Sequence, residues 1–284
     1  MINFTKVQGA GNDFVLVEDN GIERDWSKLT PAMCSRHFGI GGDGLLLVVK
    51  SRVADCRMRV FNLDGSEADA CGNGLRCVVR YVLEKGIVQP KKGTLTVETM
   101  AGVRQVRVGS GKKPQIQVFM GKPIFQAKDI PVKMEQGRNT LDIMPVLDYP
   151  LTINRKKLTL NCVSMGNPHA VYFIDTPVAD FPLEVIGPKV EKHRIFPKHV
   201  NFEIVRVLND EKFEARVWER GVGETLACGS GACAIAVMSR MHGIVNDKVD
   251  IILPGGTLNI EWDGQGEVML SGPAELVFTG EWPD

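Results

Sequence analysis

The chain has 284 residues, of which 44% are hydrophobic and 24% are charged, and its 34 basic residues balance 34 acidic ones. This size and composition fit a globular protein of one large or two medium domains. A formal net charge of zero gives no reason to expect nucleic acid or an anionic membrane as a partner. No apolar run approaches the ~18 residues needed to cross a bilayer, and the N-terminus lacks the pattern of a signal peptide.

The predicted elements are short strands interrupted by helices. Thr30-Pro31 has the pattern of an N-cap followed by proline at the first helical position, which predicts a helix through Arg36. Alternating polarity predicts strands at 56–61, 94–98, 103–108, 115–119, 212–218, 249–253, 257–262 and 267–270.

Two stronger helices follow two glycine-rich turns. The first has apolar residues at helical spacing after Gly74, and Gly86 is a plausible end. The second follows Gly231, ends at Gly243 and is apolar on most sides up to Met238. We therefore expect the second helix in the middle of its domain, surrounded by strands.

The two turns belong to a repeat. Cys71-Gly-Asn-Gly74 and Cys228-Gly-Ser-Gly231 lie 157 residues apart, and eight of 28 ungapped positions around them are identical. The same offset aligns 44–48 with 201–205, and Gly11-Asn12 aligns with Gly166-Asn167 at an offset of 155. Each half thus carries the same succession of turn, strands, cysteine turn and helix, which indicates a duplicated domain.

The predicted fold class is α/β (α+β), with two pseudo-symmetric domains. Each is expected to be a strand-rich, barrel-like sheet around a central helix, with the active site in the cleft between the domains. We place the boundary near Gly121-Lys-Pro123, which gives domains 1–122 and 123–272, and consider 273–284 as a segment that returns to the first domain.

A cysteine at the mouth of a helix has a specific chemistry. The helix start presents N–H groups and a partial positive charge, which acidify a thiol and attract an anion such as a carboxylate. Two such turns facing one another would place one sulfur on each face of an α-carbon, and moving a proton between those faces requires no metal or organic cofactor. A single Cys-Gly turn would more simply be a buried structural cysteine, but two copies in register favour catalysis at Cys71 and Cys228.

The other five cysteines have no chemical neighbours in sequence and are interpreted as structural. An odd number of scattered cysteines argues against a disulfide scaffold and favours a reducing cytoplasm. No Cys-x-x-Cys motif exists, which disfavours a structural zinc or a thioredoxin-like site. These five are Cys34, Cys56, Cys77, Cys162 and Cys233.

Some charged and polar residues admit two interpretations. Glu219-Arg220, just before the second turn, could be a surface ion pair, or could meet the ammonium and carboxylate of a zwitterion. His169 could be an ordinary loop histidine. The asparagines could be plain turn formers: Asn12, Asn62, Asn167 and Asn201.

Together these motifs resemble the diaminopimelate epimerase family along nearly the full length. The resemblance rests on Gly9-Ala-Gly-Asn-Asp-Phe14, 36–43, 61–67, Ala70-Cys-Gly-Asn-Gly74, 164–169, 219–225 and 227–231. It implies cofactor-independent interconversion of LL- and meso-2,6-diaminopimelate, a step toward lysine and peptidoglycan precursors. It also implies a small-molecule substrate and a cytoplasmic homodimer.

The resemblance also implies roles for individual residues. Cys71 and Cys228 would be the acid–base pair, with His169 and Glu219 tuning the thiols. Some family members carry Gln where this chain has Gly44, so a side-chain contact there cannot be carried over. The substrate-binding set would be Asn12, Asn62, Gly72, Asn73, Asn167, Asn201, Glu219, Arg220, Gly229 and Ser230, with no metal ligand.

Other functions remain open from the sequence. A proline racemase-like enzyme would share the fold and the paired thiols but would act on a substrate without a second polar head, which Glu219-Arg220 and the asparagines disfavour. The isomerase group that resembles phenazine-biosynthesis proteins lacks the paired cysteines. A non-catalytic module could also bind small anions at two helix starts, and it would leave the α-hydrogen of its ligand unexchanged.

Overall fold

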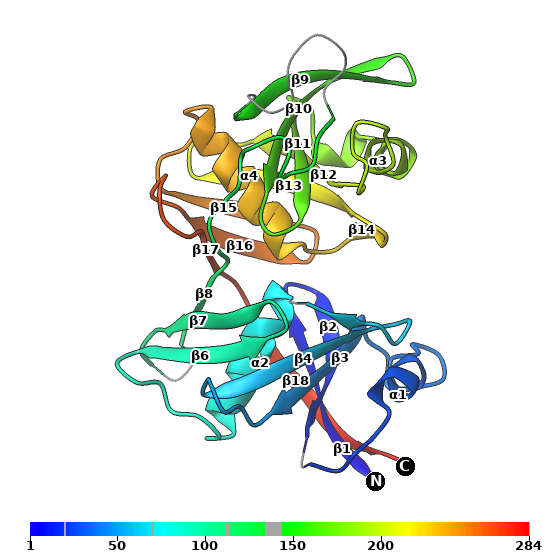
Figure 1. The fold of residues 1–284 in the computed structure, drawn as a ribbon, viewed down its shortest axis with the longest axis vertical. Coiled ribbons are helices and arrows are strands. Elements are labelled where there is room, and N and C mark those ends of the chain that lie inside the picture. The colour runs from blue at the N-terminus through cyan, green and yellow to red at the C-terminus, as the bar shows by residue number, and fades with distance from the viewer. Residues whose placement is uncertain (20, 70, 112–113, 134–143, 284) are drawn as a thin grey trace. The chain divides into compact units, whose positions relative to one another are not determined.

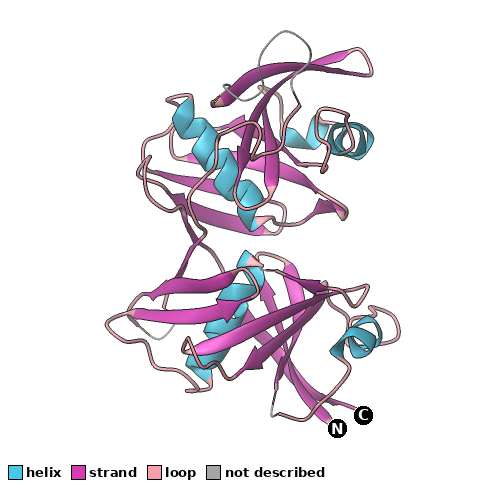
Figure 2. Ribbon diagram, viewed as in Figure 1, coloured by secondary structure: helices cyan, strands magenta, loops and turns pink. Residues whose placement is uncertain are grey.

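The structure is a computed structural model that describes residues 1–19, 21–69, 71–111, 114–133 and 144–283. Ala70, one of the repeated residues, lies outside this described part. Strands predominate over helices (Figure 2), and the mixed α/β class expected from the sequence is confirmed. The chain forms two compact units: Met1–Phe119 with Ser271–Asp284 is unit 1, and Met120–Leu270 is unit 2.

Unit 1 is built on one sheet that runs in the order β18-β1-β2-β3-β4-β6-β7-β8, with β5 paired to β4. The β2–β3 and β4–β6 pairs are parallel, and the others are antiparallel. Its strands are β1 (Ile2–Gly9), β2 (Asn12–Glu18), β3 (Gly44–Val49), β4 (Cys56–Asn62), β5 (Glu67–Ala68), β6 (Thr94–Thr99), β7 (Gly102–Val108), β8 (Ile116–Phe119) and β18 (Glu275–Trp282).

Helix α2 (Gly72–Glu84) is enclosed by this sheet. It contacts β1, β8 and β18 as well as the central strands (Figure 1). Cys71 is its N-cap residue, and Gly86 follows its end with a φ of +66°, a left-handed conformation that glycine adopts at little cost. The glycine therefore ends the helix where the sequence predicted.

Helix α1 (Trp26–Met33) corrects the predicted helix start. Its N-cap is Asp25, whose side chain accepts a hydrogen bond from the N–H of Lys28, so the helix begins before Thr30. Thr30 and Pro31 lie inside it, and the Thr30 hydroxyl donates to the carbonyl of Trp26. The proposed Thr-Pro cap was wrong because a better capping carboxylate stands five residues upstream.

Unit 2 repeats the strand pattern of unit 1. Its sheet runs β9-β10-β11-β12-β13-β15-β16, with β14 paired to β13, and β11–β12 and β13–β15 are its parallel pairs. The strands are β9 (Val146–Ile153), β10 (Lys156–Ser164), β11 (Pro168–Phe173), β12 (Asn201–Val207), β13 (Lys212–Glu219), β14 (Gly223–Thr225), β15 (Lys248–Leu253) and β16 (Gly256–Glu261).

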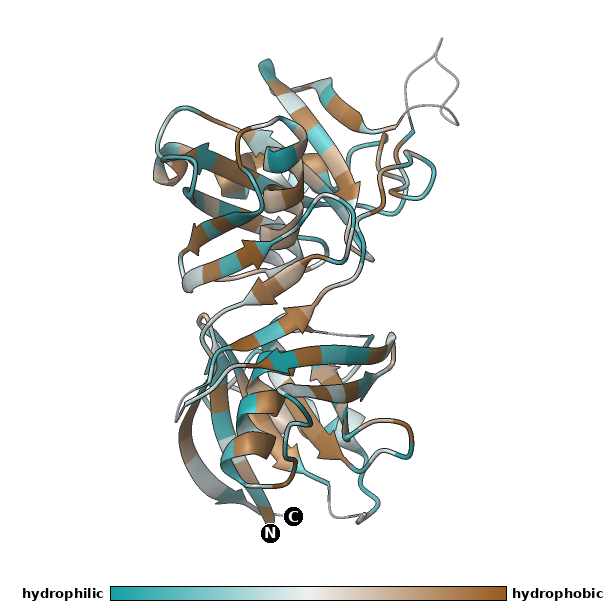
Figure 3. Cartoon of the chain, turned by 90° about the vertical axis from the view of Figure 1, so that its left-hand side faces the viewer, coloured by the Kyte–Doolittle hydropathy of each residue, from teal (hydrophilic) through white to brown (hydrophobic). Residues whose placement is uncertain are grey.

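The chain leaves unit 2 through β17 (Met269–Ser271). All eight strands expected from alternating polarity are present, with ends displaced by one or two residues. Figure 3 shows the corresponding alternation of hydrophobic and hydrophilic residues along many strands. No helix within the described ranges is long and apolar enough to cross a membrane.

Helix α4 (Gly229–Met241) is the central helix of unit 2 and is buried at nearly every position from Gly229 to Ser239. It contacts β10, β11, β12, β15 and β16. Its apolar character on most sides is therefore explained by strands around it (Figure 1). A short 3-10 helix, Val178–Asp180, precedes α3 (Leu183–Glu191), which packs on the opposite face of the sheet against β12 and β13.

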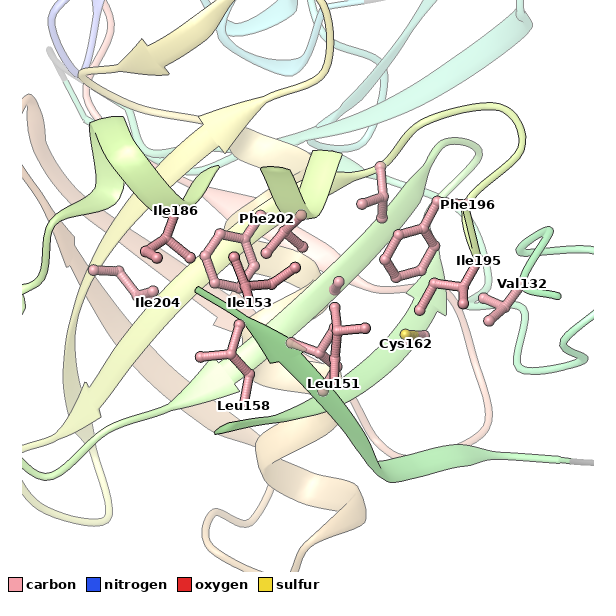
Figure 4. Packing of buried hydrophobic residues seen from close by; sticks show 14 of the residues in the cluster. Val132, Leu151, Ile153, Leu158, Cys162, Ile186, Ile195, Phe196, Phe202 and Ile204 are labelled. Atoms are coloured by element: carbon pink, nitrogen blue, oxygen red, sulfur yellow. The ribbon is translucent and has the colours of Figure 1, made fainter. Parts of the chain in front are cut away.

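Strand β12 separates two environments. Phe202 and Ile204 join Ile186 of α3, together with β9 and β10 residues, in a hydrophobic cluster (Figure 4). Because side chains alternate across a strand, Glu203 points to the other face, where α4 begins. In unit 1, Leu45 and Leu47 of β3 belong to the equivalent outer cluster beside α1.

Candidate functional site

The first cysteine turn places a partly exposed thiol at the start of α2. Cys71 has an extended backbone, and its Sγ accepts a hydrogen bond from the N–H of Gly74 at 3.3 Å. Gly72 and Asn73 are the first two helical residues, whose N–H groups point out of a helix start. The absence of a Cβ at Gly74 matters, because one would lie 2.9 Å from Cδ2 of Leu46.

Polar side chains hold the residues around Cys71 in place. Asn12 Oδ1 lies 3.9 Å from Cys71 Sγ and accepts a hydrogen bond from Asn73 Nδ2 at 3.1 Å. Asn73 in turn accepts from the guanidinium of Arg76 at 2.8 Å, and Arg76 is fully buried. The structure therefore brings Asn12, Cys71 and Asn73 together over a buried cation.

The Asn12 turn is anchored by a charged network. Asn12 Nδ2 donates to Asp43 at 2.7 Å, and Arg36 donates to both Asp13 and Asp43. Lys6 also donates to Asp13. Burial alone would raise the pKa of Asp13, but the hydrogen bonds from Arg36 and Lys6 outweigh it and hold that pKa below its ordinary value.

The second cysteine turn has the same backbone arrangement but a more buried thiol. Cys228 is the N-cap of α4, and its Sγ accepts from the N–H of Gly231 at 3.4 Å. Its side chain is 4% exposed and also lies 3.5 Å from the hydroxyl of Ser230. Gly229 and Ser230 occupy the first helical positions, as Gly72 and Asn73 do in α2.

A chain of hydrogen bonds leads from this turn into unit 2. Asn167 Nδ2 donates to Ser230 Oγ at 3.4 Å, and Asn167 Oδ1 lies 2.9 Å from His169 Nε2. His169 Nδ1 lies 2.6 Å from Glu203 Oε1, with both of these side chains fully buried. An oxygen atom thus faces each ring nitrogen, and these two contacts fix the orientation of the ring.

The remaining predicted residues of unit 2 lie at neighbouring strand ends. Glu219 accepts a hydrogen bond from the Thr225 hydroxyl at 2.6 Å and is hydrogen-bonded to the Cys228 thiol. Asn201 donates to the carbonyl of Pro168 at 2.9 Å and accepts from the backbone N–H of Arg220 at 2.9 Å. The Arg220 guanidinium is exposed and donates to the carbonyl of Lys198 at 3.2 Å.

The electrostatics of Cys228 overturn one expectation. A helix start was expected to acidify the thiol, but burial raises the pKa of Cys228 well above its ordinary value, and the carboxylates of Glu219 and Glu203 add to the effect. Burial also raises the pKa of Glu219. Cys228 is therefore a protonated thiol at neutral pH, because desolvation and two nearby carboxylates outweigh the hydrogen bonds from Ser230 and from the N–H of Gly231.

One predicted residue stands apart from this hydrogen bonding. Asn62, at the end of β4, donates to Ser66 at 3.0 Å and pairs across the sheet with Gly44. A Cβ at Gly44 would lie 2.6 Å from the carbonyl oxygen of Phe61, so a longer side chain there would require the backbone to shift. Asn62 keeps its substrate-binding role only as a prediction.

Sequence reasoning missed two buried charged residues, Glu203 and Arg76. Arg76 lies on α2 and Glu203 on β12, and neither belongs to a glycine-rich turn. The repeat carried a signal for Glu203, because the 157-residue offset places this carboxylate opposite Leu46. Within the described part of the chain, no group of three or more His, Cys, Asp or Glu side chains is arranged to hold a metal ion.

Comparison with known proteins gives a consistent result. The family model described as diaminopimelate epimerase matches residues 4–126 and 161–277. Proteins named diaminopimelate epimerase from Caldanaerobacter subterraneus subsp. tengcongensis and Halothermothrix orenii are 45% and 44% identical to this chain, covering 99% of it and 99% and 97% of their own lengths.

Solved structures share the fold at low identity. A Bacillus anthracis phenazine biosynthesis protein of the PhzF family has a TM-score of 0.68 at 17% identity, covering 100% of this chain and 99% of that one. A probable proline racemase from Agrobacterium radiobacter, with bound carbonate, has a TM-score of 0.68 at 14% identity, covering 100% of this chain and 93% of its own. These likenesses show the fold alone.

Proposed function

Because the chain belongs to the diaminopimelate epimerase family, whose reaction is the epimerisation of diaminopimelate, we propose that Cys71 and Cys228 are its two acid–base groups. The observation that carries this proposal is the repeated turn: each thiol caps a helix start in an equivalent place of an equivalent sheet. The proposal requires both turns to reach one substrate, with one sulfur on each face of its α-carbon.

The two thiols have different starting states in this mechanism. Burial and two nearby carboxylates keep Cys228 protonated in the free protein. In the reaction direction that starts from this state, Cys228 is therefore the proton donor. Cys71, as a thiolate, removes the α-proton from the opposite face as Cys228 delivers its own, which leaves Cys71 a thiol and Cys228 a thiolate for the reverse reaction. Glu219, hydrogen-bonded to the Cys228 thiol, is suited to orient that thiol for proton transfer.

The reacting carboxylate is proposed to bind the two helix starts. The N–H groups of Gly72 and Asn73 and of Gly229 and Ser230 offer donors where the helix dipole favours an anion. This charge compensation also acidifies the α-hydrogen, because the carbanion formed on its removal spreads charge into the carboxylate.

The far amino-acid end of the substrate is proposed to meet polar groups from several strand ends. Arg220 can bind the carboxylate of this end, and Glu219 can face its ammonium. A substrate without a second amino-acid end would leave both side chains without a partner group on the substrate. The asparagines complete this set: Asn12, Asn62, Asn167 and Asn201. This set supports diaminopimelate over proline as substrate.

The cellular setting is also a proposal. All seven cysteines are free thiols, which supports a reducing cytoplasm, and lysine and peptidoglycan precursors would be the destinations of the product. A homodimer follows from the resemblance to the family, and sedimentation of the purified protein tests it.

Parallel turnover assays test the substrate. Purified chain is expected to convert LL-2,6-diaminopimelate to the meso isomer and to leave L-proline unchanged. Racemisation of proline at a comparable kcat/KM would contradict the assignment of the polar far end to Arg220 and the asparagines.

A further inference from the structure

Glu203 is a fully buried carboxylate that the two-thiol mechanism does not use. It lies on β12, on the face opposite the hydrophobic cluster, and its Oε1 is 2.6 Å from His169 Nδ1. Gly231 leaves room for it, because a Cβ there would lie 3.0 Å from this same oxygen. The carboxylate therefore fills the space between β11, β12 and the first turn of α4.

The second carboxylate oxygen of Glu203 makes a buried glutamate unfavourable for folding stability. Glu203 Oε2 is buried and has no hydrogen-bond partner among the residues that the structure describes. A buried pair of charges contributes little net stability, and an unsatisfied polar atom detracts from it. Packing energy alone therefore does not explain a glutamate here.

Unit 1 shows that the fold does not require the charge. At the repeat offset of 157, Leu46 is the residue equivalent to Glu203. Leu46 Cδ2 lies next to Gly74, where a Cβ would meet it, as a Cβ at Gly231 would meet Glu203. Phe14 stands for His169, since Phe14 pairs with Gly44 as His169 pairs with Asn201. An apolar pair fills this space behind the first thiol, and an ionisable pair fills it behind the second.

We propose that Glu203 is a further positioning residue for the epimerisation, which orients the His169 ring and, through Asn167 and Ser230, the thiol of Cys228. Its carboxylate oxygen, 2.6 Å from His169 Nδ1, fixes the plane of the ring, and this directs Nε2 at Asn167 Oδ1, 2.9 Å away. The hydrogen bonds continue from Asn167 to Ser230 and from Ser230 to Cys228. The inference rests on the proposed role of Cys228.

Charge is the second route by which Glu203 acts. The titratable groups around it come from four elements: Cys162 on β10, His169 on β11, Glu219 on β13 and Cys228 at α4. Burial first, then Glu219 and Glu203, raise the pKa of Cys228. Replacing the Glu203 carboxylate with an amide removes one of these contributions, so the pKa of Cys228 falls.

The substitution Glu203→Gln tests both routes, because it keeps size and a hydrogen-bond acceptor and removes the charge. We expect kcat to fall at least about tenfold with KM changed less than about threefold, since the orientation of Cys228 is lost while no group proposed to contact the substrate is removed. Alkylation of Cys228 by iodoacetamide, followed by mass spectrometry across pH, is expected to show its midpoint at lower pH than in the parent chain. Cys71 in the same sample is the internal control and is expected to keep its midpoint.

The double variant His169→Phe with Glu203→Leu copies the Phe14 and Leu46 pair of unit 1 and controls for folding. We expect it to unfold at a temperature no lower than the parent chain while its kcat is reduced at least as far as in Glu203→Gln. Unchanged kcat and an unchanged Cys228 midpoint in Glu203→Gln would overturn the proposal, even with the parent chain active. Failure of the proposed function would appear differently, as activity retained after loss of Cys71 or Cys228.

Discussion

Cys71 and Cys228 each have two separable roles, a helix cap and a proton-transfer group. In Cys228→Ala, the sulfur that accepts from the Gly231 N–H at 3.4 Å is lost, and losing an N-cap acceptor costs about 0.5–2 kcal/mol of folding free energy. A general acid or base contributes about 10²–10⁴-fold to rate, which corresponds to about 3–5 kcal/mol of barrier. The alanine variant is therefore expected to lose both some stability and nearly all activity.

Cys228→Ser separates the two roles. A serine oxygen is a preferred N-cap acceptor, so urea unfolding is expected to give a folding free energy close to the parent value. Its hydroxyl does not ionise near neutral pH and is a much weaker acid than a thiol, so epimerisation is expected to fall as far as in the alanine variant. Cys71→Ser is expected to behave likewise at α2.

Cys77→Ala is the matched control, because Cys77 is a fully buried thiol on α2 outside the proposed mechanism. It is expected to lose stability and to keep its turnover. Activity above about 1% of the parent rate in either serine variant would refute the reasoning, since it corresponds to less than the ~10²-fold that acid–base catalysis contributes.

Three further results are expected. Arg220→Ala should raise KM by at least about tenfold, as expected for loss of a charged hydrogen bond. Arg206→Ala is the control, because Arg206 is half-buried, pairs with Glu214 and lies outside the proposed site. An unchanged KM in Arg220→Ala would return Arg220 to a surface role. Oxidation should inactivate the chain through a disulfide between Cys71 and Cys228 that dithiothreitol reverses, and peptide mapping that finds both thiols free would count against it. The free energy of unfolding in reducing buffer should decrease as pH rises above ~8.5, because unfolded thiols ionise there and the buried ones stay protonated, at about 1.4 kcal/mol per pH unit for each thiol. The thiols concerned are those of Cys34, Cys56 and Cys77, whose pKa burial raises to about 12. Urea unfolding at pH 7.5 and 9.5 checks this, and equal stability at both would contradict it.

Local sequence patterns predicted many of the strands and helix ends. Strands such as β4, β6 and β7 were predictable because one face is buried and the other is wet, which leaves a period of two in the sequence. Helix ends were predictable at Gly86, where a left-handed backbone selects glycine. The start of α1 was not, because Asp25 and Thr30 are both residue types that cap helices, and the helix begins at the upstream carboxylate, next to the buried Trp26.

The candidate site was partly predictable for the same reason. The cysteine turns were visible because their glycines are required by close approach: a Cβ at Gly74 would meet Leu46, and one at Gly231 would meet Glu203. Hydrogen-bond partners such as Arg76 and Glu203 were not, because a strand or helix pattern shows which face a residue is on and does not show what it meets there. The raised pKa of Cys228 had the same origin, since burial depends on the whole surrounding sheet.

Hydrogen isotope exchange tests the paired-thiol mechanism most directly. The chain is incubated with LL-2,6-diaminopimelate in deuterated water, and product and remaining substrate are analysed by mass spectrometry within the first few per cent of conversion. Two opposed thiols predict deuterium at the α-carbon of the meso product and none in the recovered LL substrate, because the proton removed on one face and the deuteron delivered on the other belong to different groups. Deuterium entering recovered substrate as fast as product would contradict two opposed groups and indicate a single base that exchanges with solvent.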